Sequence, residues 1–534
     1  MAEPALSPKD AQSLARLVGS DHVSTGDVDR ILYSHDRMSR SAIQSRKSLP
    51  THRPQAIVWP ANTSEVAAVV RWAGRRRLPV IAYGGGSGVS GGTVPVHGGL
   101  IVDLKRLDKI EQIQDSQLLA VVQAGILVSD LEERLHPLGY TQGHFPSSIA
   151  IATLGGSIAA RGAGQLSTKY GVIEDQIEAI EVVLPSGAVL PFDAKQVPKL
   201  PGVHALPLFI GSEGTLGIIT RARVRLHRLP ETSLYRGLSF VHLSDALVAI
   251  RRLMQSGIRP AVLRLYDPLD SLLLRWGYER GLHGGLGRIL ESVTRPILDP
   301  VLRVLNPIKK QVAGQALDQF LAHPRMFDFL MQRLPSNCLL VLGFEGDEKF
   351  IAAQEAAALN ICRASISRDE GRSLGEHWLQ HRYSVSFKMP VLFSEGNFVD
   401  TIEVAATWDR IEELYHAMRK AIARHCLVMS HFSHAYPEGC SIYFTFVGSE
   451  NKVRDELKTY DAVWHDAMDT CLRLGGTISH HHGIGLLKAR YMPQELGNLM
   501  DLFRQFKNTL DPQGIMNPGK MGLNGSKSRK QVAS

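Results

Sequence analysis

The sequence lacks any paired arrangement of cysteines. It has five cysteines, an odd number, and they are widely spaced with no C-x-x-C pair: Cys338, Cys362, Cys426, Cys440 and Cys471. A disulfide framework or a thiolate zinc site needs paired or closely spaced cysteines, so neither is expected. The N-terminus also lacks a charged-then-apolar signal pattern, and no apolar run reaches the roughly 18 residues of a membrane-spanning helix. These absences predict a protein of the reducing cytoplasm.

A strong excess of one charge is also missing. The chain has 60 Lys+Arg against 52 Asp+Glu, a net charge of +8 over 534 residues. This mild basic bias suggests an anionic partner, either a phosphate-bearing cofactor or substrate or an acidic membrane surface. No nucleic-acid-binding motif accompanies it, so nucleic acid is not expected as a partner. The length predicts two or three domains, and the 44% apolar content is typical of a globular protein.

The texture of the sequence changes along its length. Residues 1–50 read as short helical pieces, and 51–230 as short β-branched runs punctuated by glycine. Strands alternate with amphipathic helices over 231–520, and a basic tail expected to be disordered follows at 521–534. The stretch 272–320 departs from that alternation because it is apolar, basic and aromatic-containing. Such a composition fits an interfacial helix, and it equally fits an ordinary helix pair packed on the core.

A glycine-rich loop, Y-G-G-G-S-G-V-S-G-G, spans Tyr83 to Gly92 after a predicted buried strand. Gly86 to Gly91 satisfies G-x-G-x-x-G, the dinucleotide-binding fingerprint. That fingerprint requires a helix to begin within it, whereas T-V-P-V-H-G-G-L-I-V-D-L continues with proline, glycines and a strand. A Rossmann unit is therefore not expected. Successive glycines still let backbone N–H groups approach a pyrophosphate, although a simple surface loop remains the alternative.

Further segments accompany the loop in a fixed order: P-S-S-I-A-I-A-T (Pro146–Thr153), A-R-G-A (Ala160–Ala163), E-G-T-L-G-I-I (Glu213–Ile219) and N-P-G-K (Asn517–Lys520). This order resembles the vanillyl-alcohol-oxidase/PCMH flavoprotein superfamily. The resemblance implies an α+β fold with a PCMH-type FAD-binding domain and a C-terminal sheet-and-helix cap domain of the FAD-linked oxidase type. The FAD contacts that it implies are Ala82, Tyr83, Gly84, Gly85, Gly86, Ser87, Gly88, Pro146, Ser147, Ser148, Ala152, Thr153, Ala160, Arg161, Gly162, Ala163, Glu213, Gly214, Thr215, Gly217 and Ile219.

The mode of FAD attachment follows from the same loop. Members with covalent flavin carry a histidine or cysteine at the isoalloxazine, and the glycine loop has neither. We therefore expect non-covalent FAD. His144, just before the second segment, is the alternative attachment point.

Members that oxidise D-2-hydroxy acids carry H-x-G-D-G-N-x-H and later E-H-G-I-G, whose histidines and glutamate can hold a divalent metal. The matching stretches here are Y-P-E-G-C-S-I-Y (Tyr436–Tyr443) and H-H-G-I-G (His481–Gly485). Tyrosines stand in place of both histidines, and His481 stands in place of the glutamate, so we expect no metal. Successive side chains diverge along a chain, which also disfavours a site built from His480, His481 and His482. A polar loop without chemistry remains the alternative for these histidines.

The motifs C-S-I-Y-F and S-H-H-H-G-I-G are similar to those of the alkylglycerone-phosphate synthase (alkyl-dihydroxyacetonephosphate synthase) family. The resemblance implies that Tyr443 removes a proton from C1 of acyl-dihydroxyacetone phosphate, and we expect one or two of the three histidines to face the flavin pocket as its partners. A flavin N5 adduct would hold the substrate while the acyl chain leaves and a long-chain fatty alcohol enters, with no net redox change. Arg264 would lie at the active site, and Lys388 stands where the family places a phosphate-binding arginine. Because a tyrosine has a pKa near 10, it needs such neighbours to act as a base.

Two other functions stay open. One is an FAD-dependent dehydrogenase or oxidase of a D-2-hydroxy acid or another alcohol, and the other is a non-catalytic flavin-binding or lipid-binding protein. The expected location is cytoplasmic, with peripheral membrane contact through 272–320, and a homodimer is left open.

Overall fold

The computed structural model describes residues 3–190, 206–281, 324–325, 337–383, 397–449 and 455–523. Chain contacts divide the molecule into two compact units. Unit 1 comprises Met1–Gly164, Tyr170–Leu229 and His481–Ser534, and unit 2 comprises Gln165–Lys169 and Pro230–His480. The C-terminal segment from His481 therefore folds with the N-terminal half of the chain. Lys388, most of 272–320 and the end of the basic tail lie outside the described residues, and the expected domain boundaries stay predictions.

Unit 1 contains a small, largely parallel sheet of strand order β1-β2-β4-β3. Strands β2 and β3 both run parallel to β4, and β1 pairs antiparallel with β2. Helix α4 covers this sheet because Val66, Val69 and Val70 recur on one helix face and join the strand residues in a buried core. The elements are α1 (Pro8–Val18), β1 (Val23–Ser24), α2 (Asp27–Leu32), α3 (Ser39–Ser45), β2 (Ala56–Val58), α4 (Thr63–Arg76), β3 (Val80–Tyr83) and β4 (Leu100–Asp103).

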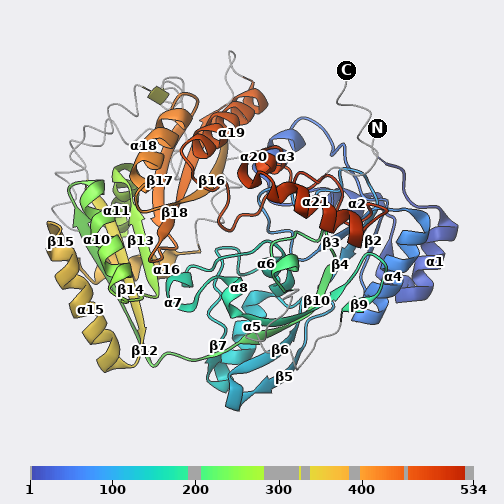
Figure 1. Ribbon diagram of the computed structural model, residues 1–534, viewed down its shortest axis with the longest axis horizontal. Helices are drawn as coiled ribbons and strands as arrows, with labels where there is room; N and C mark the ends of the chain where they lie inside the picture. The colour runs from blue at the N-terminus through green and yellow to red at the C-terminus, as the bar shows by residue number, and fades with distance from the viewer. Residues whose placement is uncertain are drawn as a thin grey trace. The chain divides into compact units, whose positions relative to one another are not determined.

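A second sheet of unit 1 is antiparallel, with strand order β5-β6-β10-β8-β9. Its apolar face joins helices α5, α6 and α8 in a second core. These elements run from blue to green in Figure 1. The remaining elements of unit 1 are β5 (Ile110–Gln114), β6 (Leu119–Gln123), α5 (Val128–Leu135), β7 (Tyr140–Thr141), α6 (Leu154–Ala159), α8 (Ile173–Gln176), β8 (Ile177–Val183), β9 (Val189–Leu190), α9 (Leu206–Phe209), β10 (Ile218–Arg225), β11 (His227–Arg228), α20 (Met492–Leu496) and α21 (Leu499–Leu510). Helix α7 (Ser167–Tyr170) belongs to unit 2 except for its last residue.

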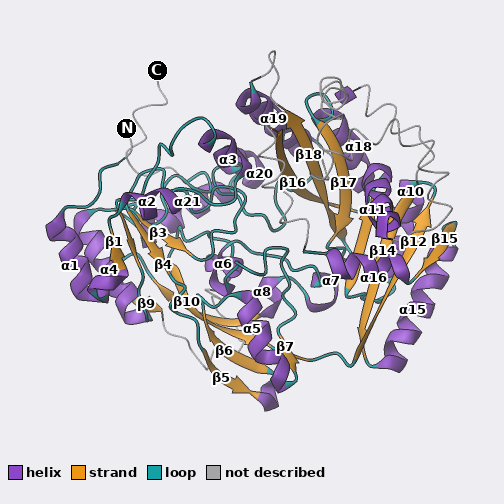
Figure 2. Ribbon diagram, turned by 180° about the vertical axis from the view of Figure 1, so that it is seen from behind, coloured by secondary structure: helices purple, strands orange, loops and turns teal. Residues whose placement is uncertain are grey.

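Unit 2 is built on a seven-stranded antiparallel sheet of order β15-β12-β14-β13-β17-β18-β16 (Figure 2). Tyr415 of helix α18 packs against Phe432 of β17 and Phe444 of β18, which fixes the helix-covered face of those strands. The elements are β12 (Thr232–Phe240), α10 (Leu243–Gln255), β13 (Val262–Tyr266), α11 (Pro268–Gly281), β14 (Cys338–Gly346), α15 (Glu348–Arg363), β15 (Ser367–Gly371), α16 (Ser373–His381), β16 (Asn397–Thr407), α18 (Ile411–Ile422), β17 (Leu427–Ser433), β18 (Gly439–Ser449) and α19 (Glu456–Arg473).

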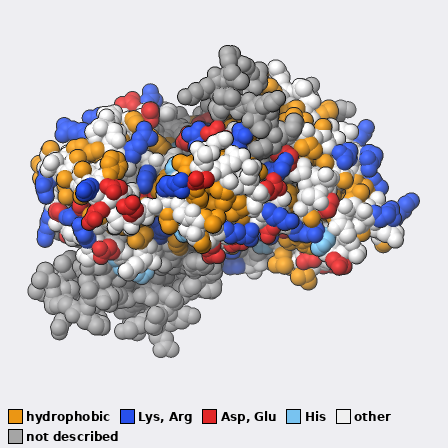
Figure 3. Space-filling view, turned by 90° about the horizontal axis from the view of Figure 1, so that it is seen from below, with side chains coloured by type: hydrophobic (Ala, Val, Ile, Leu, Met, Phe, Trp, Pro, Cys, Tyr) orange, Lys and Arg blue, Asp and Glu red, His pale blue; other side chains and the backbone are white. Residues whose placement is uncertain are grey.

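The surface and the helices bear on two expectations from the sequence. Among the described residues, no helix has both the length and the apolar character needed to cross a bilayer. On the face seen in Figure 3, basic side chains are interspersed with acidic ones over the described surface and form no single patch. The small positive net charge is thus spread out on this face.

Candidate functional site

The glycine loop of unit 1 lies directly against the segment Pro146–Thr153. A Cβ on Gly85 would stand 1.5 Å from the carbonyl oxygen of Ile151, and one on Gly84 would stand 2.2 Å from Oγ1 of Thr153. Thr153 in turn caps helix α6, because its Oγ1 accepts a hydrogen bond from the backbone N–H of Gly156 at 3.2 Å. Only glycine allows this approach of two backbones, which explains the run of glycines after β3.

The segment from Glu213 lies beside both α6 and the C-terminal H-H-G-I-G loop. The backbone N–H of Glu213 donates to the carbonyl of Ala159 at 2.9 Å. Its carboxylate accepts hydrogen bonds from the backbone N–H groups of Ile484 and Gly485, the latter at 2.8 Å to Oε2. Burial raises the pKa of Glu213, and these two donors oppose the shift. Since the carboxylate is engaged by the loop, a cofactor contact from this residue would come from its backbone.

The N-P-G-K segment joins the same cluster. The side-chain amide of Asn517 donates to the carbonyls of Gly92 at 2.9 Å and of Glu213 at 2.7 Å. Lys520 is buried, and its Nζ donates to the carbonyl of Val94 at 2.6 Å. Burial lowers the pKa of Lys520 to about 8, while the charges of Glu213 and Asp36 act in the opposite direction. The predicted FAD-binding segments, which are far apart in sequence, thus converge within unit 1.

Buried polar atoms beside these segments suit a polar cofactor. Among the described residues, the side chains of Gln142 and His144 are fully buried, and neither amide atom of the first nor either ring nitrogen of the second has a hydrogen-bond partner. Burial, with His481 acting in the same direction, lowers the pKa of His144 to about 4, so its imidazole is neutral. Buried polar groups are normally paired, so the unsatisfied atoms of His144, which lies beside Gly162 of the predicted Ala160–Ala163 segment, fit a site for the polar parts of FAD.

In unit 2 a polar row crosses the sheet on the face opposite Phe432 and Phe444. Glu403 of β16 is the cross-strand partner of Tyr443 of β18, which in turn is the partner of His431 of β17. Cross-strand partners project from the same face, so the register places these three side chains side by side. The His431 and Tyr443 rings stack with centroids 4.6 Å apart.

Charged neighbours complete this row. Arg264 of β13 donates from its guanidinium to Nε2 of His431, and Nδ1 of His431 lies 3.4 Å from Oδ2 of Asp270. Burial, followed by the charge of Arg264, lowers the pKa of His431 well below its usual value, so this imidazole is neutral. Burial raises the pKa of Asp270 to about 7, with Arg264 opposing. Burial and the charge of Glu403 raise the pKa of Tyr443 well above 10, so it rests as a neutral phenol.

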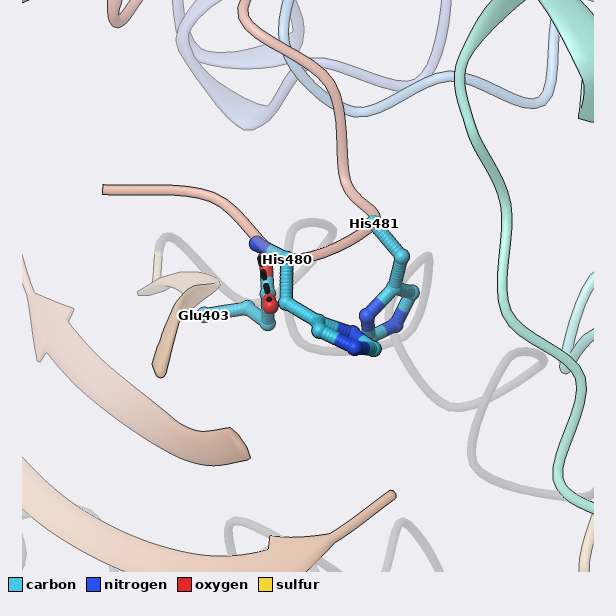
Figure 4. A group of neighbouring side chains, drawn as sticks. All are labelled: Glu403, His480 and His481. Carbon is cyan, nitrogen blue, oxygen red and sulfur yellow. Dashed lines mark hydrogen bonds between the residues drawn. The ribbon is translucent and has the colours of Figure 1, made fainter. Parts of the chain in front are cut away.

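Two more imidazoles adjoin Tyr443. Nε2 of His434 lies 3.1 Å from the Tyr443 hydroxyl, and Nδ1 of His434 lies 2.7 Å from Oγ of Ser167. The His434 and His480 rings stack with centroids 5.7 Å apart. The backbone N–H of His480 donates to Oε1 of Glu403 at 2.8 Å, the bond drawn in Figure 4. This arrangement can hold and move protons around a phenol.

Glu403 and His480 of unit 2 also offer an oxygen and a nitrogen atom within 4.8 Å of each other (Figure 4). Carboxylate and imidazole groups can bind a divalent cation. This pair supplies two ligands, and a structural or catalytic zinc takes at least three protein ligands. The expected absence of a metal stays a prediction.

The predicted catalytic residues are thus distributed as follows. Tyr443, Arg264 and His480 belong to one cluster of unit 2, whereas His481 and His482 belong to unit 1. The carbonyl of His482 accepts a hydrogen bond from Oγ of Ser90 at 3.1 Å. Sequence reasoning missed five members of the cluster, and the only local signal for any of them is the H-F-S-H spacing on and after β17: Ser167, Asp270, Glu403, His431 and His434.

Comparisons with known proteins bear on the domains, the cofactor and the fold of this chain. The family model described as an FAD binding domain matches residues 54–193, and that described as the C-terminal domain of FAD linked oxidases matches 310–521. The chain is 28% identical to the alkyldihydroxyacetonephosphate synthase of Trypanosoma brucei brucei, covering 97% of this chain and 81% of the relative. It is 26% identical to that of Dictyostelium discoideum, with 96% and 80% covered. The glycolate oxidase subunit GlcD of Bacillus subtilis is 25% identical, with 97% of each chain covered.

Solved structures of flavoproteins also superpose on this chain. An alkyldihydroxyacetonephosphate synthase superposes with a TM-score of 0.74 at 25% identity, covering 96% of this chain and 85% of that one. A p-cresol methylhydroxylase superposes with a TM-score of 0.71 at 16% identity, covering 97% and 96%, which bears on the fold alone.

The chain therefore carries an FAD binding domain and a C-terminal domain of the FAD-linked oxidase type, which support an FAD-dependent enzyme, and its cofactor is FAD. The predicted α+β fold, a PCMH-type FAD-binding domain with a C-terminal sheet-and-helix domain, is confirmed. It is similar to alkyldihydroxyacetonephosphate synthases over most of its length, as its motifs predict.

Proposed function

We propose that this enzyme replaces the acyl chain of acyl-dihydroxyacetone phosphate with a long-chain fatty alcohol, the step that forms an ether lipid. One observation carries the proposal: His431, His434 and Glu403 surround Tyr443. A metal-dependent oxidase would have a metal-binding histidine in place of this tyrosine. A phenol among imidazoles is suited to remove and return a proton. The similarity to two alkyldihydroxyacetonephosphate synthases over most of their length supports the same reading.

In the proposed reaction the C1–O bond to the acyl group breaks and the fatty carboxylate leaves. A new bond forms between C1 and the alcohol oxygen, and the hydroxyl proton of the alcohol balances the carboxylate as fatty acid. Bound FAD supplies a conjugated centre that can accept and return an electron pair, so the exchange has no net redox change. Tyr443 removes the proton from C1 and later returns it. Arg264 offsets negative charge beside Tyr443, and Lys388 is proposed to bind the substrate phosphate.

The remaining parts of the proposal concern location. The enzyme acts in the cytoplasm, with peripheral membrane contact through 272–320, which would give long-chain substrates access. The small basic excess of the sequence supports contact with an anionic lipid surface. Flotation with anionic vesicles should carry the full chain, and a variant lacking 282–320 should stay in the soluble fraction. If both stay soluble, this contact is not made.

One pair of assays tests the proposed reaction. Purified holoenzyme receives acyl-dihydroxyacetone phosphate and a fatty alcohol together under anaerobic conditions, while released fatty acid and the flavin spectrum are followed. We expect fatty acid release that requires the alcohol, with no net bleaching. Tyr443→Phe should lower kcat by about 10²–10⁴-fold with FAD retained, and His425→Gln, changed at a histidine bonded to Asp466, should match wild type. Absence of fatty acid release in wild type would refute the proposal.

The alternative is oxidation of a D-2-hydroxy acid, favoured by the similarity to the glycolate oxidase subunit GlcD and by the neighbouring groups of Glu403 and His480. It predicts that D-lactate or glycolate bleaches the flavin anaerobically and that an electron acceptor restores the colour. It also predicts stimulation by Mn²⁺ or Zn²⁺ that Glu403→Gln abolishes. Bleaching without fatty acid release would favour this alternative.

A further inference from the structure

His434 occupies an unusual position between two hydroxyl groups of unit 2. Its Nδ1 lies 2.7 Å from Oγ of Ser167, and its Nε2 lies 3.1 Å from Oη of Tyr443. Each ring nitrogen therefore faces one hydroxyl at hydrogen-bonding distance. A neutral imidazole has one donor and one acceptor nitrogen, so one of these hydroxyls must donate to it and the other must accept.

The backbone of His434 indicates that this position is specifically held. His434 follows the last residue of β17 and has a φ of 51°, in the left-handed region that a side chain with a Cβ rarely adopts. Its side chain is buried between β18 and the segment Gln165–Lys169, with 7% of its surface exposed. Strained residues persist where the surrounding structure fixes them, and they cluster at functional sites. The surrounding structure thus holds the imidazole between Ser167 and Tyr443 in spite of the strained backbone.

We propose that His434 is the proton acceptor that converts Tyr443 into a base, an inference that rests on the function proposed above. Nδ1 carries the resting proton and donates it to Oγ of Ser167, and Nε2 accepts the hydrogen bond from the Tyr443 hydroxyl. The O–H bond of Tyr443 breaks, and its proton passes to Nε2, giving a phenolate and an imidazolium. The phenolate takes the C1 proton and becomes a phenol, and it becomes a phenolate again when it returns that proton. His434 keeps its extra proton throughout, so charges and protons balance over the cycle.

The surrounding charges explain why a dedicated acceptor is needed. Unaided, Tyr443 stays a protonated phenol because burial and Glu403 raise its pKa well above 10, so the phenolate that would act as the base is scarce. His431 also stacks on Tyr443, but its Nε2 faces the Arg264 guanidinium, and that charge, with burial, lowers its pKa well below its usual value. His431 is therefore a poor proton acceptor, and the imidazole nitrogen at hydrogen-bonding distance from the Tyr443 hydroxyl is Nε2 of His434. Among the residues that the structure describes, the titratable and charged groups that face the His434–Tyr443 pair are Glu403, Arg264, His431, Asp270, Tyr436 and His480.

His434 acts through Tyr443, so it is a positioning residue whose test must separate proton acceptance from packing. His434→Gly suits this purpose because glycine adopts a positive φ without strain and leaves space for a free imidazole. We expect its kcat to fall by about 10²–10⁴-fold with KM little changed and FAD retained. Added imidazoles of different pKa should restore activity at least tenfold, and the extent should rise with their basicity. His425→Gly, which removes an imidazole bonded to Asp466, is the matched control and should behave as wild type with and without imidazole.

A second variant guards against poor folding of the first. Ser167→Ala keeps the imidazole and removes only the acceptor of Nδ1–H, so we expect about a tenfold lower kcat and a changed pH profile. NMR of ¹⁵N-histidine-labelled holoenzyme provides a readout independent of turnover. We expect the Nδ1–H tautomer at His434, and a pKa for its imidazole that changes in Tyr443→Phe and not in His425→Gly.

The outcomes separate the two proposals. If wild type shows no exchange activity, the proposed function is wrong, and the NMR tautomer still decides whether Tyr443 donates to His434. If wild type is active but His434→Gly is too, or its rescue is independent of imidazole basicity, the inference is overturned. An Nε2–H tautomer in the resting enzyme would overturn it as well.

Discussion

The carboxylate of Glu213 should hold the H-H-G-I-G loop in unit 1, and this prediction can be worked out in magnitude. The loop is anchored because the backbone N–H groups of Ile484 and Gly485 donate to this carboxylate. Glu213→Gln keeps the shape of the side chain but removes its charge and one of its two acceptor oxygens. Glu213→Ala leaves both N–H groups without this acceptor.

Hydrogen bonds to a charged group contribute about 1.5–3 kcal/mol, against about 0.5–1.5 kcal/mol for neutral pairs. The loss from Glu213→Gln is therefore roughly 1 kcal/mol for each N–H, or about 2 kcal/mol for the loop. Glu213→Ala should cost about 4 kcal/mol, since each unsatisfied buried donor costs roughly 1–3 kcal/mol. A change of about 1.4 kcal/mol corresponds to a factor of ten, so local opening should rise about 30-fold in the first variant and roughly 10³-fold in the second.

Hydrogen exchange of the peptide covering residues 481–490 measures this opening directly. Glu111→Gln is the matched control, because Glu111 pairs with Arg221 at 2.9 Å on the surface of unit 1. Surface ion pairs contribute about 0–1 kcal/mol, so exchange over 481–490 should be unchanged in the control. Equal exchange of this peptide in wild type and Glu213→Ala, with FAD and fold retained, would show that the carboxylate does not hold the loop.

Two further predictions follow from the geometry. Gly85→Ala should destabilise the apoprotein by about 3 kcal/mol through overpacking and lower its FAD content, because its Cβ would meet a backbone carbonyl at 1.5 Å. Gly88→Ala is the control: its Cβ has its nearest neighbour at 3.6 Å, so this variant should unfold at the wild-type temperature. Equal thermal unfolding of the two apoproteins would contradict this. Asp270 has a pKa raised to about 7 by burial, so between about pH 4 and 7 the native state binds more protons than the unfolded state, and its stability falls as pH rises. Asp270→Asn should remove that contribution, which urea unfolding at several pH values would measure, and parallel stability curves for variant and wild type would show that Asp270 does not titrate in this way.

The FAD-binding half of the molecule could be predicted largely from its sequence. The runs around Ile57, Ile81 and Ile101 form β2, β3 and β4 as their β-branched composition indicates. The glycine loop also follows a strand, without the helix of a Rossmann unit, as proposed. Glycine and proline determine the backbone conformation at their own positions, so their order along the chain predicts where strands end and loops begin.

The cluster around Tyr443 could not be predicted to the same extent. Ser167 and His434 are 267 residues apart, and only the tertiary fold brings them together. Glu403 reads as an ordinary polar residue in a strand, because its place beside Tyr443 depends on the register of β16 against β18. Pairing registers between distant strands are set by whole-sheet packing, which no short motif encodes. The triple histidine drew attention to His480, whereas His434 is the imidazole that contacts the Tyr443 hydroxyl.

Successive side chains of β18 project to opposite faces of the sheet, so the register of this strand decides which residue faces the polar row. Tyr443 and Phe444 are neighbours in sequence, but one projects toward the polar row and the other toward helix α18. An insertion or deletion of a single residue within this strand would exchange the two, placing a phenyl ring beside His431 and a hydroxyl against the aromatic core. Insertions or deletions within β18 should therefore be tolerated only when they change its length by two residues or lie at its ends. Most side chains on its helix-facing side, in contrast, can vary among apolar types of similar volume.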